Sequence, residues 1–223
     1  SQPGTLADTA GTILALYQLY EIDFSPKYYK GMLMLFRAMQ TDFASDGVFY
    51  DDAAKHVPHM ILQPSNLQDN VTPSGNALAC HVHWLLYQLE TAPSHRESLT
   101  AMLRNLGDMM TEHPHSFGYW LQLADLSAYS TQQIVLVSPD DRVSNLPFTQ
   151  EIHQIFNPYR VVAAKKVPSS QDIGIPSICQ NRSLIDGKAT AYICENFTYQ
   201  LPITDINAFK NAIQHLRSTK GDA

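Results

Sequence analysis

Apolar residues recur at every third or fourth position through the first half of this chain, and this period predicts amphipathic helices. The first run consists of Leu6, Ala10, Ile13, Leu14 and Tyr17. Further runs begin near residues 26, 72 to 74, 94 and 116. The run at 94 is predicted to form one helix as far as Met110, and Ser94-His95-Arg96-Glu97 fits a capping box at its start. Ser25 directly before Pro26 is typical of a helix start, so the connection between the first two helices is expected to be short. The first half is therefore predicted to consist of helical hairpins.

The pattern changes near Thr131, where short β-branched and alternating runs replace the helical period. The expected elements are strands at 134–137, 160–164 and 189–194, a helix at 149–156 and a last helix that Asp205 caps. The first two strands and the helix between them resemble a βαβ unit. We therefore expect a mainly α fold with helical hairpins over residues 1–130 and a small C-terminal α/β subdomain over residues 131–223.

Composition and charge exclude several classes of protein. With 223 residues and 44% hydrophobic content, the chain can bury the core of one or two domains. The net charge is -6 and the 15 Lys and Arg residues form no basic stripe, so a nucleic-acid partner is not expected. No apolar run approaches the roughly 18 to 20 residues of a membrane span, and no signal peptide is visible. Three cysteines without short spacing argue against a disulfide framework and favour reduced thiols in the cytoplasm.

The segment from Asp69 to Asn76 opens a helix with the sequence Thr-Pro-Ser-Gly-Asn at its end. Ser74 can accept a hydrogen bond from the amides of the first turn, and Gly75 permits a close approach of another backbone. This structural interpretation needs no ligand. Alternatively, the helix start binds an anion or sugar hydroxyls through Ser74 and Asn76, with Asp69 as a nearby acceptor. Both interpretations remain open from the sequence.

Three carboxylates, Asp8, Asp51 and Asp69, lie at predicted helix starts or turns. Hydrolysis of a glycosidic bond needs two carboxylic groups that flank the bond, so any two of them that face one cavity are catalytic candidates. Capping and the helix dipole also favour aspartate at a helix start. The sequence assigns a catalytic role to none of them.

The nine histidines provide no metal site by their spacing. His81 and His83 are two positions apart, so on a helix they point in different directions and cannot share a metal. An epimerase mechanism would need two histidines as acid and base, and His81 is the best candidate for one of them. No cofactor or metal is expected.

Two segments, Asp69–Asn76 and Cys194–Asp205, together resemble the C-terminal portion of a thioredoxin-domain-containing family. That family includes spermatogenesis-associated thioredoxin-like proteins of animals and many bacterial homologues. The stretch Gly47–Asp51 is similar to the family's Gly-Phe-Phe-Asp turn, and the resemblance covers essentially the whole chain. Leu6–Ala10 matches only in part, and Tyr199 stands where the family commonly has a second cysteine. In this family a thioredoxin-like domain precedes a toroid of the (α/α)6 type, similar to sugar epimerases and glycosidases.

The resemblance implies that residues 1–130 form an arc of such a toroid, because five helices cannot close a ring of six hairpins. The thioredoxin-like domain would lie outside this chain. An open arc exposes surface that the remaining hairpins would cover, so we expect association with the N-terminal thioredoxin-like and helical segments, or self-association. The alternative is that the fifth helix and the α/β unit seal the arc.

Two functions remain open. The chain is either a non-catalytic or incomplete scaffold, or a fragment of a carbohydrate-active, epimerase- or glycosidase-like enzyme. The enzyme would bind a sugar-like small molecule near the inner-helix N-termini, at Asp8, Asp51, Asp69, Ser74 and Asn76. An aromatic-lined pocket with residues such as Tyr50 and Trp84 would favour the enzyme, and an apolar patch without converging polar groups would favour the scaffold.

Overall fold

The structure is a computed structural model that describes residues 4–45, 48–53, 63–140, 143, 146–167, 174–195, 198–199 and 201–215. The chain divides into two compact units. One comprises Ser1–Tyr20 and Ser25–Tyr129 and is called the helical unit; the other comprises Glu21–Phe24 and Ser130–Ala223 and is called the α/β unit. The fold is mainly α with a small C-terminal α/β region, as predicted.

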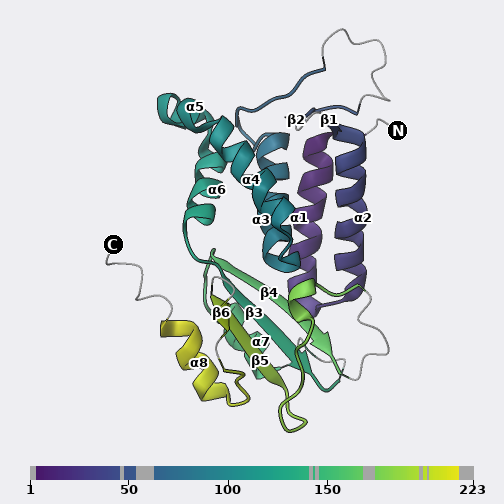
Figure 1. The fold of residues 1–223 in the computed structure, drawn as a ribbon, viewed down its shortest axis with the longest axis vertical. Coiled ribbons are helices and arrows are strands. Elements are labelled where there is room, and N and C mark those ends of the chain that lie inside the picture. The colour runs from purple at the N-terminus through teal and green to yellow at the C-terminus, as the bar shows by residue number, and fades with distance from the viewer. Residues whose placement is uncertain are drawn as a thin grey trace. The chain divides into compact units, whose positions relative to one another are not determined.

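The helical unit is built from two long helical hairpins, a small β-hairpin and shorter helices (Figure 1). Its helices are α1 (Leu6–Asp23, whose last residues belong to the α/β unit), α2 (Pro26–Phe43), α3 (Gly75–Glu90), α4 (Pro93–Asn105), α5 (Gly107–Glu112) and α6 (Gly118–Ala128). A 3-10 helix, η2 (Pro114–Ser116), precedes α6, and strands β1 (Ala44–Ser45) and β2 (Val48–Phe49) pair antiparallel after α2. The predicted turn residues Asp46 and Gly47 lie outside the described residues.

Helix α3 is the core of the helical unit. It is buried on nearly every side, with only a few half-buried positions, and it packs against α4 and α6. At its first residue, Gly75, a Cβ atom would lie 3.1 Å from the backbone nitrogen of Ala7. The N-terminal ends of α1 and α3 therefore approach more closely than a larger residue would allow.

Local sequence signals predicted most of the helix starts correctly. Ser25 is the N-cap of α2 and Pro26 its first residue, although the cap bond is to the Ser25 carbonyl, which accepts from the Tyr28 amide. Ser74 is the N-cap of α3, and its hydroxyl accepts from the Ala77 amide at 3.2 Å. Asp205 caps α8 (Ile206–His215) by accepting from the Ala208 amide.

The predicted capping box at Ser94 is wrong. Helix α4 begins at Pro93 with Ala92 as its N-cap, because proline at the first helical position sets the start one residue earlier. The single helix predicted to run on to Met110 is also interrupted. At Leu106 the backbone leaves the helical conformation, and α5 begins at Gly107.

The α/β unit contains a four-stranded sheet with the order β4-β3-β5-β6. Its elements are β3 (Gln132–Ser138), α7 (Pro147–Gln154), β4 (Arg160–Lys166), a 3-10 helix η4 (Ser177–Cys179), β5 (Thr190–Glu195), β6 (Thr198–Tyr199) and α8. Strands β3 and β4 are parallel, which confirms the predicted βαβ unit, and β5 is antiparallel to β3. The sequence did not predict β6. Helices α7 and α8 pack through Phe148 and Phe209, whose ring centroids are 4.9 Å apart.

Candidate functional site

Segment 63–70 is tied to β2 and to the N-terminal turns of α3 and α6, where most of the predicted site residues lie. The Ser65 hydroxyl donates to the carbonyl oxygen of Phe49 at 2.6 Å. The indole nitrogen of Trp120 donates to the carbonyl oxygen of Leu67 at 2.8 Å. The Asp51 amide donates to the Pro64 carbonyl oxygen at 2.8 Å. The backbone of this segment is therefore fixed by several different elements.

Asp69 joins the starts of two helices. One carboxylate oxygen accepts from the amide of Ser74 at 2.9 Å, and the other accepts from the amide of Tyr119 in α6 at 2.8 Å. Amides at helix N-terminal ends lack partners within their own helix. The Asp69 carboxylate supplies those partners and so holds α3 and α6 together at this end.

Ser74 and Asn76 connect the start of α3 to the same segment. Besides capping α3, the Ser74 hydroxyl donates to the Leu67 carbonyl oxygen at 3.3 Å. Asn76 is 2% exposed, and its amide nitrogen lies 3.1 Å from the carbonyl oxygen of Asn66 and 3.3 Å from that of Phe49. The Asn76 side chain thus links segment 63–70 to β2 by donating to a backbone carbonyl of each, as a backbone N–H group would.

Asp51 meets the same segment. Its carboxylate accepts from the Asn66 amide at 2.9 Å, while its backbone carbonyl accepts from the Leu6 amide at the start of α1. Burial raises the pKa of Asp51, the Asn66 amide opposes this rise, and the negative charge of Asp52 adds to it.

Asp8 has a different environment. It is exposed, and its carboxylate accepts from both the amide and the hydroxyl of Thr5 at 2.9 Å, while the Asp8 amide donates to that hydroxyl. These reciprocal bonds form a capping box. The bonds from the Thr5 amide and hydroxyl lower the pKa of Asp8. Segment 63–70 therefore brings together four of the five predicted residues, Asp51, Asp69, Ser74 and Asn76, whereas Asp8 bonds within the first turn of α1.

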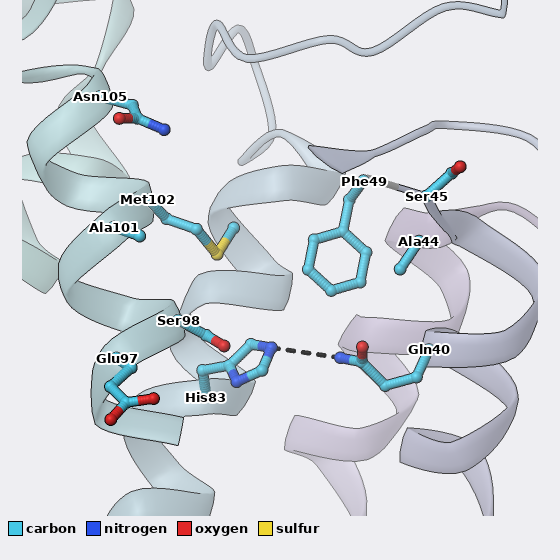
Figure 2. Close-up of a pocket in the computed structure, with 10 residues that line it drawn as sticks. All are labelled: Gln40, Ala44, Ser45, Phe49, His83, Glu97, Ser98, Ala101, Met102 and Asn105. Carbon is cyan, nitrogen blue, oxygen red and sulfur yellow. Dashed lines mark hydrogen bonds between the residues drawn. The ribbon is translucent and has the colours of Figure 1, made fainter. Parts of the chain in front are cut away.

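A hollow of about 420 Å³ lies beside this region, between α2, the β1–β2 hairpin, α3 and α4 (Figure 2). It is lined by Gln40, Ala44, Ser45, Phe49, His83, Glu97, Ser98, Ala101, Met102 and Asn105. A second hollow of about 200 Å³ adjoins it and shares Phe49, Met102 and Asn105. Asn76, Ser65, Leu67 and Trp120 also line the second hollow. Asn76 is thus the one predicted site residue that lines either of these two hollows.

His83 forms the buried polar group of the larger hollow. Its exposed fraction is 4%, and its Nε2 lies 3.2 Å from the amide nitrogen of Gln40. Its Nδ1 lies 3.3 Å from Nδ1 of His95. Because an amide NH2 group can only donate, His83 accepts at Nε2, carries its proton on Nδ1 and donates that proton to His95. Burial, together with the neighbouring His95, lowers the pKa of His83 to about 4, so this ring is neutral at neutral pH.

Aromatic rings enclose the histidine pair. The ring of Phe36 contacts His83 and His95 edge-on, with centroid distances of 5.6 and 5.2 Å, and the ring of Phe49 lies 6.0 Å from that of His83. These contacts explain why the pair is desolvated. They also show that His83 is held from α2, β2 and α4 at once.

His81, the predicted acid or base, has other partners. Its Nδ1 lies 2.7 Å from the hydroxyl of Tyr119, its ring contacts Trp84, and burial lowers its pKa to about 4. Trp84 is buried and Tyr50 half-buried, and neither lines the two hollows. Within the described ranges, no group of three or more His, Cys, Asp or Glu residues could hold a metal ion.

The sequence did not identify Gln40, His83 and His95 as a group. They come from three helices, so no local spacing connects them. One signal was available: Gln40 follows Phe36 by one helical turn and places an amide beside the apolar side of α2.

Comparison with known proteins finds no matching family model. The chain is 24% identical to spermatogenesis-associated protein 20 of Homo sapiens over 206 residues and 23% identical to that of Rattus norvegicus over 205 residues. The protein of Mus musculus is 24% identical over 206 residues. Each match covers 91% of this chain and 26% of the relative, so the chain spans about a quarter of the length of the curated relatives it matches. These matches confirm the resemblance that Asp69–Asn76 and Cys194–Asp205 indicated.

Proposed function

We propose that this chain is a non-catalytic scaffold portion of a larger, thioredoxin-fused protein, and that its helical unit is an arc of an (α/α)6-type toroid. Two helical hairpins, α1–α2 and α3–α4, supply the repeating element that such a toroid needs. The similarity to spermatogenesis-associated protein 20 over 91% of the chain supports a common fold for the aligned region. Cys80, Cys179 and Cys194 form no disulfide with one another, which is consistent with a reducing compartment such as the cytoplasm.

The observation that carries this proposal is the bonding of Asp69. Both of its carboxylate oxygens accept from amides at helix starts. The polar groups of Ser74 and Asn76 likewise bond to the chain itself. These hydrogen bonds account for the polar residues at the helix starts without a ligand, as structural capping requires.

The alternative is a carbohydrate-active enzyme fragment with its site at the helix starts. Such a mechanism needs two carboxylic groups on either side of one glycosidic bond. Asp8, Asp51 and Asp69 each accept from a different amide, and none of them lines the two hollows of the helical unit. The scaffold role is therefore favoured over this one, and a sugar-binding role for these residues remains a prediction.

Light scattering of the purified chain tests the scaffold role, alone and mixed with a separately made thioredoxin-like and early helical segment from the same source. We expect the chain alone to self-associate and the mixture to form a complex of fixed stoichiometry. An unrelated thioredoxin is the control and should not associate. A monomeric chain that ignores the matched segment at high concentration would contradict the proposal.

A further inference from the structure

The two adjoining hollows of the helical unit form an open groove that capping of the helices does not explain, and its lining residues Ser45, Glu97, Ala101 and Asn105 are exposed. The larger has a volume of about 420 Å³, within the range of roughly 300 to 1,000 Å³ that is typical of small-molecule sites. The shared residues Phe49, Met102 and Asn105 show that the smaller hollow lies next to the larger one.

The walls of the larger hollow combine an apolar surface with several neutral polar groups. Phe49, Met102, Ala44 and Ala101 supply the apolar surface. Figure 2 shows the side chains of Met102, Ser98 and His83 on one side and those of Phe49 and Gln40 on the other. The amides of Gln40 and Asn105 contain both donors and acceptors, as do the hydroxyls of Ser45 and Ser98. A hydroxyl group of a ligand both donates and accepts, so such walls suit it better than they suit a group that only accepts.

Charge narrows the class of ligand further. His83 is neutral at neutral pH, and Glu97 is the one carboxylate among the described residues that line either hollow; no Lys or Arg lines them. Arg96 and Arg104 line a further hollow that shares Glu97 and Ala101 with the larger one, but within the larger hollow itself an anionic ligand would meet the carboxylate of Glu97 and no cation. Glu97 is itself exposed at the edge, so it provides no buried partner for a cationic ligand either.

From these contacts we infer that the hollow between α2, the β1–β2 hairpin, α3 and α4 binds a small, neutral, polyhydroxylated molecule. The ring of Phe49 covers its C–H face, and the polar groups of Gln40, Ser98 and Asn105 surround its hydroxyls, whereas both ring nitrogens of His83 are already bonded to Gln40 and His95. This site differs from the helix-start residues, and it does not depend on the scaffold role. His83 is held by Gln40 and His95 before any ligand arrives, so its orientation carries no ordering cost on binding.

Ligand-observed NMR by saturation transfer, with the whole chain, tests this site. The neutral probes are glucose and myo-inositol, and the charged probes are glucosamine and glucose 6-phosphate, all at millimolar concentration. We expect saturation transfer to at least one neutral probe and none to the phosphate. Transfer to glucosamine but to neither neutral probe would overturn the neutral class.

A matched pair of substitutions locates the site. Ala101→Phe fills the larger hollow from α4, and Ala15→Phe places the same side chain at an exposed position of α1 outside the hollows. We expect Ala101→Phe to weaken binding of the neutral probe about tenfold or more, and Ala15→Phe to leave it unchanged. The far-UV circular dichroism of both variants should match that of the original chain. Equal binding by the two variants, or no transfer to either neutral probe from the folded chain, would overturn the proposal.

Discussion

At the scale of single residues, Asp69 makes the clearest contribution, because one carboxylate serves two helix starts. In Asp69→Asn one oxygen remains, but an NH2 group faces the amide of Ser74 or Tyr119, so two donors oppose each other. We expect the free energy of unfolding to fall by roughly 1 to 3 kcal/mol, measured by urea denaturation. Asp108→Asn, at an exposed position, is the control and should change it by less than about 0.5 kcal/mol. Equal effects would show that the two hydrogen bonds are not stabilising.

His83 gives a second prediction at this scale. Its pKa is about 4 in the folded chain, below the ordinary histidine value of 6.5. Between these two pH values the unfolded chain binds a proton at His83 that the folded chain does not bind. The contribution of His83 to stability is therefore complete above the upper pKa and decreases as the pH falls. From about pH 7 to about pH 5 this residue should lower the free energy of unfolding by roughly 2 kcal/mol.

Urea denaturation of His83→Gln at these two pH values measures this effect. The variant should lose stability less steeply with decreasing pH than the original chain does, whatever its stability at neutral pH. In His83→Gln some loss of stability with decreasing pH should remain, because burial also lowers the pKa of His81 to about 4. His113→Gln, at an exposed position, should keep the original slope. Identical slopes for His83→Gln and the original chain would contradict the prediction.

At the scale of elements, the close approach of α1 and α3 depends on Gly75. A Cβ atom there would lie 3.1 Å from the backbone nitrogen of Ala7 and 3.2 Å from Cγ of Leu6. We expect Gly75→Ala to lower the thermal midpoint, with a cost of roughly 1 to 3 kcal/mol because a backbone atom must shift. In Gly118→Ala, at the start of α6, the added Cβ meets nothing within 4 Å, so that variant should be neutral or slightly stabilised. A Gly75→Ala variant as stable as the original would show that the two helices separate at little cost.

The sequence predicted those elements whose signal is local. It did not predict those that depend on a contact with residues far away in the sequence. Ser74 and Asp205 mark helix starts because a cap bonds within one turn. Ser94 misled because Pro93 begins α4 one residue earlier. The two residues of β6 carry no pattern of their own, since only pairing with Cys194 and Glu195 defines the strand. The same holds for the candidate site. The motif that ends at Asn76 could be recognised in the sequence, whereas His83 and His95 become neighbours only when α3 and α4 pack together.

At the scale of the whole molecule, each unit has its own core, and the chain's two tryptophans make the units separable by spectroscopy. Trp84 and Trp120 both lie in the helical unit, so their fluorescence reports that unit, whereas far-UV circular dichroism reports the helices of both. Phe209 is fully buried against Phe148 in the α/β unit.

Phe209→Ala should therefore destabilise the α/β unit by roughly 3 to 5 kcal/mol through the cavity it leaves. We expect part of the circular dichroism change to move to lower urea concentration, while the tryptophan fluorescence transition stays in place. Phe156→Ala makes the same chemical change at a side chain that is 81% exposed, so it leaves no cavity. In this control the circular dichroism and fluorescence transitions should both stay where they are in the original chain. If both signals of Phe209→Ala shift equally, the two cores unfold as one cooperative unit, because the loss of packing in one would then destabilise the other to the same extent.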